Sequence, residues 1–252
     1  MIATGSISTV IEKTVATITF SHPASNSFPS ALLQELTDEL YALNKNTSLS
    51  IIVIKSEGTN TFCSGASFDE LLALDTEAEG TEFFSGFANV LNAMRTCHKL
   101  IIGRIHGKAV GGGVGLAAAC DYCFATDSSL IRLSELAVGI GPFVIEPALS
   151  RKLSKMAFTE LALNPTVWKS AQWALENKLY SEVLPTADAL DERLHSFVSE
   201  LSSYNPLALS SIKKVLWEGT ENWEELLYER AAISGKLVLS EATKIALQKF
   251  KK

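Results

Sequence analysis

The stretch from residue 100 to residue 121 decides the fold, and it reads LIIGRIHGKAVGGGVGLAAACD. Residues 100–105 form an apolar run that is typical of a strand covered on both faces. Gly111, Gly112 and Gly113 indicate a tight bend, because glycine adopts backbone conformations that other residues avoid. Residues 114–120 are rich in Ala and Leu and indicate a buried helix. The stretch therefore predicts a strand, a bend and a helix in close succession.

Similar patterns lie on both sides of this stretch. The other expected strands cover residues 7–20 (two strands), 51–54, 121–126 and 130–133. A helix is expected to open at Pro29-Ser30, and another to cover residues 69–95, with a mobile acidic segment at residues 75–82. Strands that alternate with helices predict an α/β fold. Beyond about residue 150 strand signals are sparse, and amphipathic helices run to Lys252.

The composition excludes several classes of protein. The chain has 252 residues and a net charge of −6, which argues against a general nucleic-acid binder. Four cysteines in this length make no disulfide scaffold. The first residues lack a basic start followed by an apolar segment, and the most apolar stretches are too short to cross a bilayer. We therefore expect a reduced, cytoplasmic protein that binds neither nucleic acid nor membrane.

Two loops of small residues each follow an apolar strand and precede a helix. One contains Ser64, Gly65 and Ala66, and the other contains the three glycines. The first turn of a helix presents backbone N–H groups without intrahelical partners. Two such groups from different loops would form an oxyanion hole. On the sequence pattern alone, a purely structural bend explains the three glycines equally well.

The order of these motifs resembles the enoyl-CoA hydratase/isomerase (crotonase) family. The resemblance rests on residues 22–28 (HPASNSF), 63–68 (CSGASF), 106–116 (HGKAVGGGVGL), 119–121 (ACD) and 134–139 (SELAVG). Residues 162–183 and 205–213 are also similar, so the likeness covers nearly the whole chain.

The resemblance implies a fold and a substrate. The fold is a spiral of repeated β-β-α units, with an α/β core over residues 1–190 and a helical oligomerisation region over residues 191–252. The implied substrate is an acyl-CoA thioester, and no separate cofactor or metal is implied. The implied assembly is a homotrimer or a hexamer. Apolar residues in the C-terminal region are expected to be buried against other subunits, namely Leu194, Phe197, Val198, Leu226, Leu227, Ile233 and Leu237.

The resemblance also assigns residues to the site. Ala66 and Gly112 match the two backbone donors that hold the thioester oxygen. Ala24 and Ser64 would lie along the CoA moiety, and Phe143 would wall the acyl pocket. Residues 69–95 would line that pocket. Lys249 matches a lysine that reaches the CoA of a neighbouring subunit, although a solvated basic tail explains it equally well.

Hydratases of the family usually carry two glutamates, and here only one of these positions is acidic. Gly115 stands at the first position and Glu135 at the second. Isomerases of the family commonly manage with one carboxylate, because a single base can remove a proton and return it elsewhere. Glu135 is therefore the expected base, with a surface or capping role as its alternative. Substitutes for the missing partner are Glu146, Asp69 and Glu70.

Other reactive residue types are better explained by packing. Cys120 and Cys123 have redox or zinc spacing, but structural zinc needs about four ligands. Cys63 is expected to pack, and His106 to lie in the core or cap a strand. Asp121 is expected to brace a loop.

Three functions remain open at this point. The preferred one is double-bond isomerisation of an enoyl-CoA with Glu135 as base. The nearest alternative is hydration of an enoyl-CoA, including a branched or carboxylated one such as methylglutaconyl-CoA. The third is a protein that binds CoA esters after losing efficient catalysis.

Overall fold

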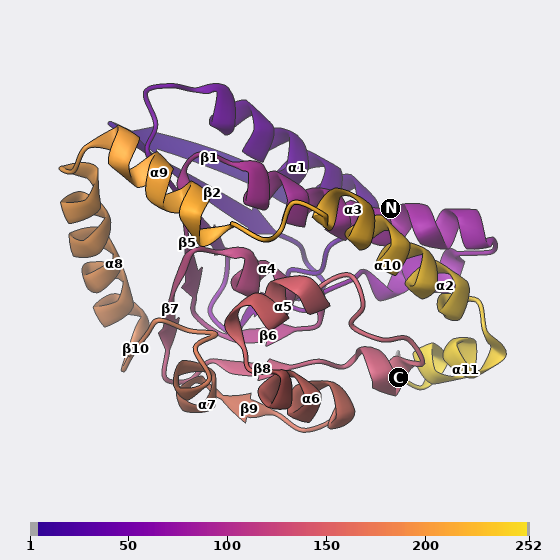
Figure 1. The fold of residues 1–252 in the computed structure, drawn as a ribbon. Coiled ribbons are helices and arrows are strands. Elements are labelled where there is room, and N and C mark those ends of the chain that lie inside the picture. Colours follow the sequence, from indigo (N-terminus) through magenta and orange to yellow (C-terminus); the bar gives the residue numbers. More distant parts are fainter. Residues whose placement is uncertain (1–4, 251–252) are drawn as a thin grey trace.

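Two β-sheets form the centre of the computed structural model, which describes residues 5–250 (Figure 1). Six strands form one sheet in the order β1-β2-β3-β5-β7-β10, and four form the other in the order β4-β6-β8-β9. The strands are β1 (Ser6–Glu12), β2 (Val15–Ser21), β3 (Ile51–Ser56), β4 (Thr61–Cys63), β5 (Leu100–Ile105), β6 (Lys108–Val110), β7 (Tyr122–Thr126), β8 (Leu130–Arg132), β9 (Lys169–Ser170) and β10 (Glu182–Leu184).

Successive strand pairs are shared between the two sheets. The pairs β3/β4, β5/β6 and β7/β8 each give their first strand to the larger sheet and their second to the smaller one. Strands β2, β3, β5, β7 and β10 run parallel, and β1 is antiparallel to β2. Helices follow the second strand of each pair. The predicted α/β spiral of β-β-α units is therefore confirmed.

Helices cover the sheets and form the C-terminal part of the chain. They are α1 (Ser30–Lys45), α2 (Phe68–Ala73), α3 (Glu77–Thr96), α4 (Gly112–Ala119), the 3₁₀ helix η1 (Glu135–Val138), α5 (Glu146–Lys152), α6 (Lys155–Leu163), α7 (Ala171–Glu176), α8 (Ala187–Ser202), α9 (Pro206–Leu216), α10 (Trp223–Val238) and α11 (Glu241–Phe250). The helix expected at Pro29-Ser30 is present, and its regularly spaced leucines are buried.

The segment predicted as one helix over residues 69–95 consists of two. Helix α2 ends at Ala73, and α3 begins at Glu77. The Thr76 side chain accepts a hydrogen bond from the Glu79 N–H, and the Glu79 carboxylate accepts one from the Thr76 N–H. This capping box starts a new helix within the acidic segment that we expected to be mobile.

Two short strands beyond residue 150 also escaped the sequence pattern. Strand β10 completes the larger sheet beside β7, and β9 completes the smaller one beside β8. Both are too short for an alternation of apolar and polar residues to be detected. The expected domain boundary at residues 190/191 falls inside α8, whose Leu190, Leu194 and Val198 pack on the larger sheet. The division into a core and an oligomerisation region remains a prediction.

Six of the seven apolar residues that we expected to be buried by other subunits pack, at least in part, within their own chain, which corrects that expectation. Leu194, Val198 and Leu227 are buried, and Phe197 stacks on Tyr122 with ring centroids 4.7 Å apart. Ile233 remains exposed. The reason is that α8 and α10 dock on the core instead of forming a separate appendage.

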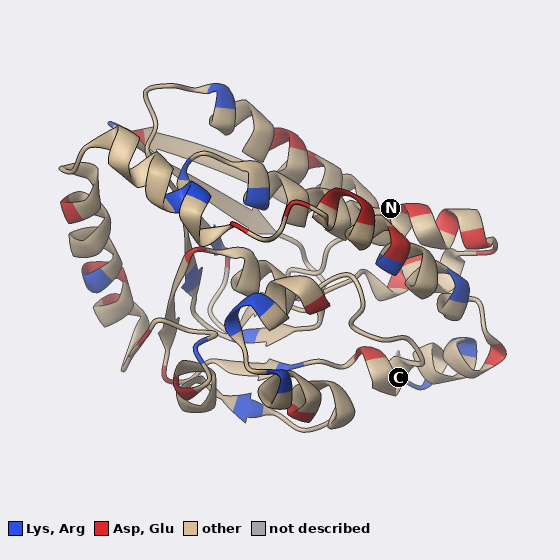
Figure 2. Cartoon of the chain, in the orientation of Figure 1, with Lys and Arg blue, Asp and Glu red and all other residues tan. Residues whose placement is uncertain are grey.

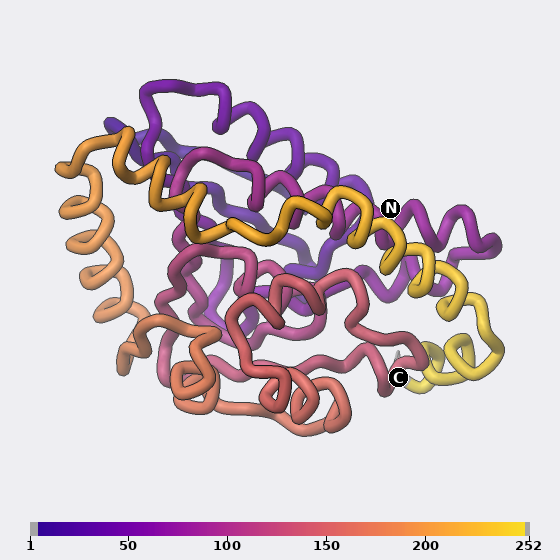
Figure 3. Tube along the Cα trace, in the orientation of Figure 1, coloured from indigo at the N-terminus to yellow at the C-terminus, as the bar shows by residue number. Residues whose placement is uncertain are grey.

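The close packing of α10 on α3 brings the end of the chain back to its middle (Figure 3). A β-carbon placed on Gly80 would lie 2.7 Å from the carbonyl oxygen of Gly235, so glycines at the crossing let the two backbones approach. Helix α11 then packs against η1, where the hydroxyl of Thr243 donates to the carbonyl of Gly139 at 2.9 Å. The C-terminal helices thus enclose the region that contains Glu135.

Charged residues of both signs are interspersed over the helices in the view of Figure 2. Helix α9 carries a stripe of exposed apolar side chains, Leu207, Ile212, Val215 and Leu216. None of the helices within residues 5–250 has both the length and the apolar character needed to cross a membrane.

Candidate active site

A largely apolar pocket lies where the two small-residue loops meet η1. Its walls come from the segment after β4, from α2 and α3, from the start of α4, and from residues 134–145. The lining residues are Ser64, Gly65, Ala66, Phe68, Leu71, Phe84, Phe87, Gly111, Gly112, Ser134, Glu135, Val138, Ile140, Gly141, Pro142, Phe143, Val144, Ile145 and Ser234. The structure therefore brings Ser64, Ala66, Gly112, Glu135 and Phe143 together around one cavity.

The first loop pairs with the segment after β2, which fixes its backbone. Phe28 donates its N–H to the Gly65 carbonyl at 2.7 Å and accepts the Ser67 N–H at 3.1 Å. Gly65 has a φ of +84°, a value that favours glycine. The N–H of Ala66, which lies between these bonds, has no acceptor among the described residues. It is therefore available to a bound molecule.

The second loop enters α4 through Gly111, whose φ is +52°. The Gly111 N–H donates to the Arg132 carbonyl at 2.9 Å, whereas the N–H of Gly112 has no acceptor within residues 5–250. A β-carbon placed on Gly65 would lie 3.2 Å from the Gly112 nitrogen, so the two loops are in contact. Two unpartnered N–H donors, one from each loop, thus border the same pocket.

Glu135, the first residue of η1, places its carboxylate against the second loop. A β-carbon placed on Gly111 would lie 2.7 Å from Glu135 Oε1, so only glycine leaves room for the carboxylate there. Glu135 Oε2 is buried and has no hydrogen-bond partner among the described residues. Burial away from water raises the pKa of Glu135 to about 7, because the apolar surroundings disfavour the charged form. A carboxyl group with this pKa can accept and return a proton near neutral pH.

The place of a second carboxylate is filled by an apolar side chain. A β-carbon placed on Gly115 would lie 2.6 Å from Cβ of Ile145, which is 4% exposed. Ile145 therefore occupies the space beside Gly115. The Phe143 ring instead folds onto Gly141.

The three other carboxylates considered as partners do not line the pocket. Glu70 accepts hydrogen bonds from the N–H and the hydroxyl of Ser30, at 2.8 and 2.5 Å. Glu146 accepts one from the Ser150 hydroxyl and lies 3.8 Å from Arg230. Asp69 lies in the first turn of α2. Glu135 is thus the sole ionisable side chain among the described residues that line the pocket.

Two predicted CoA contacts lie outside the cavity. The carbonyl of Ala24 accepts a hydrogen bond from the Ser64 hydroxyl at 3.2 Å, so the Ala24 loop borders the first loop at the surface. Lys249 is exposed on α11 and does not line the pocket of its own chain. Its predicted contact with a neighbouring subunit stays a prediction.

Several lining residues could not be found from the sequence. Phe84 and Phe87 lie in the stretch expected to line the acyl pocket, but their pattern is that of any buried helix face. Ile145 is one of several apolar residues that follow Gly141. Ser234 reaches the pocket from α10, and no local signal connects it with the other lining residues, which lie at least 89 positions earlier.

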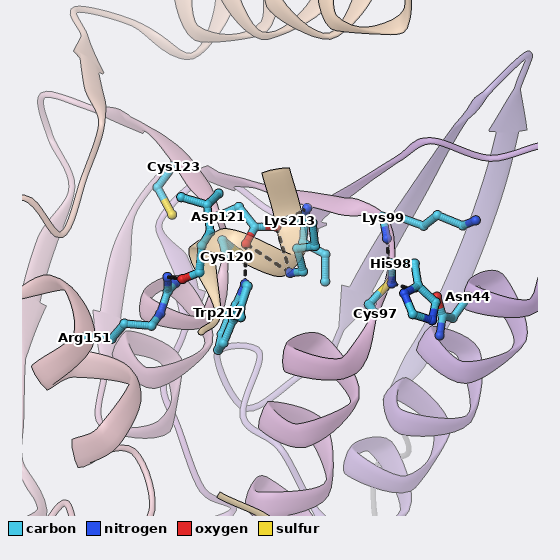
Figure 4. A network of polar contacts seen from close by, with 12 residues as sticks. Asn44, Cys97, His98, Lys99, Cys120, Asp121, Cys123, Arg151, Lys213 and Trp217 are labelled. Carbon is cyan, nitrogen blue, oxygen red and sulfur yellow. Dashed lines mark hydrogen bonds and ion pairs between the residues drawn. The ribbon is translucent and has the colours of Figure 1, made fainter. Parts of the chain in front are cut away.

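The reactive residues that the sequence pattern assigned to packing are buried and do not line this pocket. Cys63, Cys120 and Cys123 are fully buried free thiols. Burial lowers the pKa of His106 to about 4, and neither of its ring nitrogens has a partner among the described residues. Asp121 braces the start of β7, as expected, within the network shown in Figure 4. No cluster of three potential metal ligands occurs in residues 5–250.

Comparison with known proteins agrees with this architecture. The family model for enoyl-CoA hydratase/isomerase matches residues 10–251. A probable enoyl-CoA hydratase of Bacillus subtilis (strain 168) is 27% identical over 97% of this chain and 95% of its own. A peroxisomal Delta(3,5)-Delta(2,4)-dienoyl-CoA isomerase of Arabidopsis thaliana is 25% identical over 74% of this chain and 71% of its own.

The fold has the same relatives. The crystal structure of an enoyl-CoA hydratase from Bacillus halodurans superposes with a TM-score of 0.88, over 96% of this chain and 99% of that one, at 21% identity. Its likeness concerns the fold alone, whereas the family model matches the sequence nearly end to end. Enzymes of that family act on CoA thioesters, and their reactions include hydration and isomerisation. This chain belongs to the enoyl-CoA hydratase/isomerase family.

Proposed function

We propose that this protein shifts the carbon–carbon double bond of an enoyl-CoA, with Glu135 as its only base. The isolation of that carboxylate carries the proposal. Glu135 is the one ionisable group among the described residues of the pocket wall, and its Oε2 has no hydrogen-bond partner there. Isomerisation needs no more than one base, because the proton removed from one carbon is returned to another.

The reaction begins with a 3-enoyl-CoA. Glu135 removes a proton from C2, and the electron pair moves into the thioester, whose oxygen becomes negative. The N–H groups of Ala66 and Gly112 donate to that oxygen, and they stabilise it because they are already oriented in a site that excludes water. Glu135 then returns the proton to C4 while the double bond moves from C3–C4 to C2–C3. The carboxyl group ends in its starting state.

The acyl chain would extend along the aromatic and aliphatic wall that includes Phe84, Phe87 and Phe143. CoA would leave the pocket past Ser64 and Ala24, at the surface where these loops meet. Assembly into a homotrimer or hexamer would bring Lys249 to the CoA of a neighbouring subunit. The exposed apolar stripe of α9 supports association, since Leu207 is 77% and Val215 61% exposed.

The discriminating experiment follows absorbance with two substrates. A 3-enoyl-CoA gains conjugation when it is isomerised, whereas crotonyl-CoA loses conjugation when it is hydrated. We expect a gain with the first and little change with the second. Loss with crotonyl-CoA, or with a branched or carboxylated 2-enoyl-CoA, would instead identify a hydratase. No change with either, together with retained binding of a saturated acyl-CoA, would identify a binding protein.

A further inference from the structure

Two glycines at the start of α4, Gly111 just before its first residue and Gly115 within it, are each covered by a side chain from the segment after β8. Gly111 and Gly115 are four residues apart and are joined by the Gly115 N–H···O=C Gly111 bond of 3.2 Å. Residues with this spacing lie on the same face, about one turn or 5.4 Å apart. Glu135 covers Gly111, and Ile145 covers Gly115. The side chain seated on Gly115 is therefore the neighbour of the Glu135 carboxylate.

Ile145 gives that neighbouring position no polar atom. It is 4% exposed, and the adjacent Val144 is equally buried. A buried water molecule needs two to four polar partners to be held in place. Beside Gly115, where no side chain is present, the branched Ile145 removes both the space and the partners for such a water.

We infer that Ile145, seated on Gly115, is the residue that makes this site isomerise rather than hydrate its substrate. The inference rests on the proposed isomerisation and specifies how the reaction is selected. Hydration requires a water whose oxygen bonds to C3 of a 2-enoyl-CoA while a proton is delivered to C2 and the double bond is consumed. With Ile145 in place, no water is held beside Glu135 to attack C3. The proton on Glu135 is then transferred only to C2 or C4 of the substrate, which isomerises it.

A pair of variants that differ in one group isolates this effect. Ile145→Thr keeps the branched shape and introduces a hydroxyl, whereas Ile145→Val keeps the shape without one. Both remove one methylene, so any effect of a smaller side chain is common to both. The hydroxyl of threonine supplies a second partner for a water next to the Glu135 carboxylate.

The measurement is hydration of crotonyl-CoA in ¹⁸O-labelled water. Mass spectrometry gives the amount of ¹⁸O in the 3-hydroxyacyl product. We expect Ile145→Thr to incorporate label at least about tenfold faster than the wild type, because one added hydrogen bond to the water changes the rate by about that factor. Ile145→Val should match the wild type. Equal rates for the two variants would overturn the inference. A wild type that fails to isomerise 3-enoyl-CoA would contradict the proposed function instead, and the two failures are thereby separate.

A second measurement tests the contact itself. Gly115→Ala places a β-carbon against Ile145 and should lower the melting temperature by roughly 5 °C, because overpacking a core is destabilising. The control background is Ile145→Gly, which removes the Cβ as well as the rest of the side chain, and there the same Gly115→Ala change should lower the melting temperature much less. If Gly115→Ala costs as much in the Ile145→Gly background as in the wild type, Ile145 does not occupy the space beside Gly115. Should Gly115→Ala not fold, recovery of a folded Gly115→Ala/Ile145→Gly variant supports the same contact.

Discussion

Two carboxylates are removed from water in this molecule, and their surroundings are opposite. Asp121 accepts a hydrogen bond from the Ile101 N–H at 2.7 Å. It also accepts bonds from Lys213 Nζ at 2.8 Å and from Trp217 Nε1 at 2.6 Å (Figure 4). Glu135 has one oxygen against Gly111 and another with no partner in the described part of the chain. The difference between the two carboxylates therefore lies in their partners.

The Asp121 network is a structural device. The side chains of Asp121 and Lys213 are 3% and 2% exposed, and their ion pair fastens α9 to the junction of α4 and β7. The guanidinium of Arg151 stacks on Trp217 at 3.9 Å and extends the cluster. None of these residues lines the pocket. A buried charge surrounded by matched hydrogen-bond donors is stabilised where it lies.

Glu135 is the reverse case. Its surroundings offer no counter-charge and few donors, which raises its pKa to about 7. The folded protein tolerates this unfavourable burial at the position where a base is needed. The comparison teaches that the number of partners, more than burial itself, separates a structural carboxylate from a reactive one.

The largest effect is expected when Asp121 loses the positive charge of Lys213. Lys213→Met leaves the Asp121 charge buried without an ion-pair partner, so the free energy of unfolding should fall by about 3–5 kcal/mol. Urea unfolding measures it. The control is Glu224→Gln, which removes the partner of Arg95 at a side chain that is 73% exposed and should change stability by less than about 1 kcal/mol. Similar losses in the two variants would contradict the structural reading of the Asp121 network.

The next effect concerns catalysis. Glu135→Gln keeps the size of the side chain and removes the base, so the rate of isomerisation should fall by about a hundredfold or more while acyl-CoA affinity changes little. Steady-state kinetics and calorimetric binding of a saturated acyl-CoA measure the two quantities. Glu146→Gln is the matched control, because Glu146 lies eleven residues further along the chain and outside the pocket lining. A fully active Glu135→Gln variant would remove Glu135 from the mechanism.

The sequence predicted the elements that local pattern controls. The strands over residues 51–54 and 100–105, the bend at Gly111 and the helix behind it follow from apolar runs and glycine, and all are present. The two small-residue loops meet at one pocket, as their equivalent places after neighbouring strands suggest. Neither prediction required knowledge of contacts between distant residues.

The parts that escaped prediction depend on such distant contacts. Ile145 acquires its role only because α4 lies beneath it, and nothing in the residues around it indicates Gly115. Ser234 and the glycines of the α3–α10 crossing likewise gain meaning from packing. The Asp121–Lys213 pair joins residues that are 92 positions apart. A periodic pattern cannot report pairings of this kind.

The pH dependence of the rate should reveal the unpartnered carboxylate. The base acts when deprotonated, so kcat/KM for a 3-enoyl-CoA should fall about tenfold for each pH unit below about 7. The rate is measured between about pH 5.5 and 9. Circular dichroism checks that the fold stays intact over this range. Cys123 also has its pKa lowered to about 7, mainly by the hydrogen bond with Cys120. Cys123→Ala should therefore leave the profile in place, and a profile that disappears in this variant would assign it to the thiol.

The last effect is a change of stability with pH that arises from the raised pKa of Glu135. The pKa of Glu135 is raised from about 4.5 to about 7, so between these values the folded protein holds a proton that the unfolded chain has released. Its stability therefore falls as the pH rises from 4.5 to 7, and the whole penalty is present above pH 7. Glu135→Gln removes the penalty and should stabilise the protein by up to about 3 kcal/mol at pH 8, with almost no difference near pH 4.5. Asp121→Asn should instead destabilise the protein at pH 8, because it leaves Lys213 as a buried cation without its counter-charge. Urea unfolding of the three proteins at both pH values decides the matter. A Glu135→Gln variant that is less stable than the wild type at pH 8 would show that the Glu135 carboxylate, like that of Asp121, holds its surroundings together.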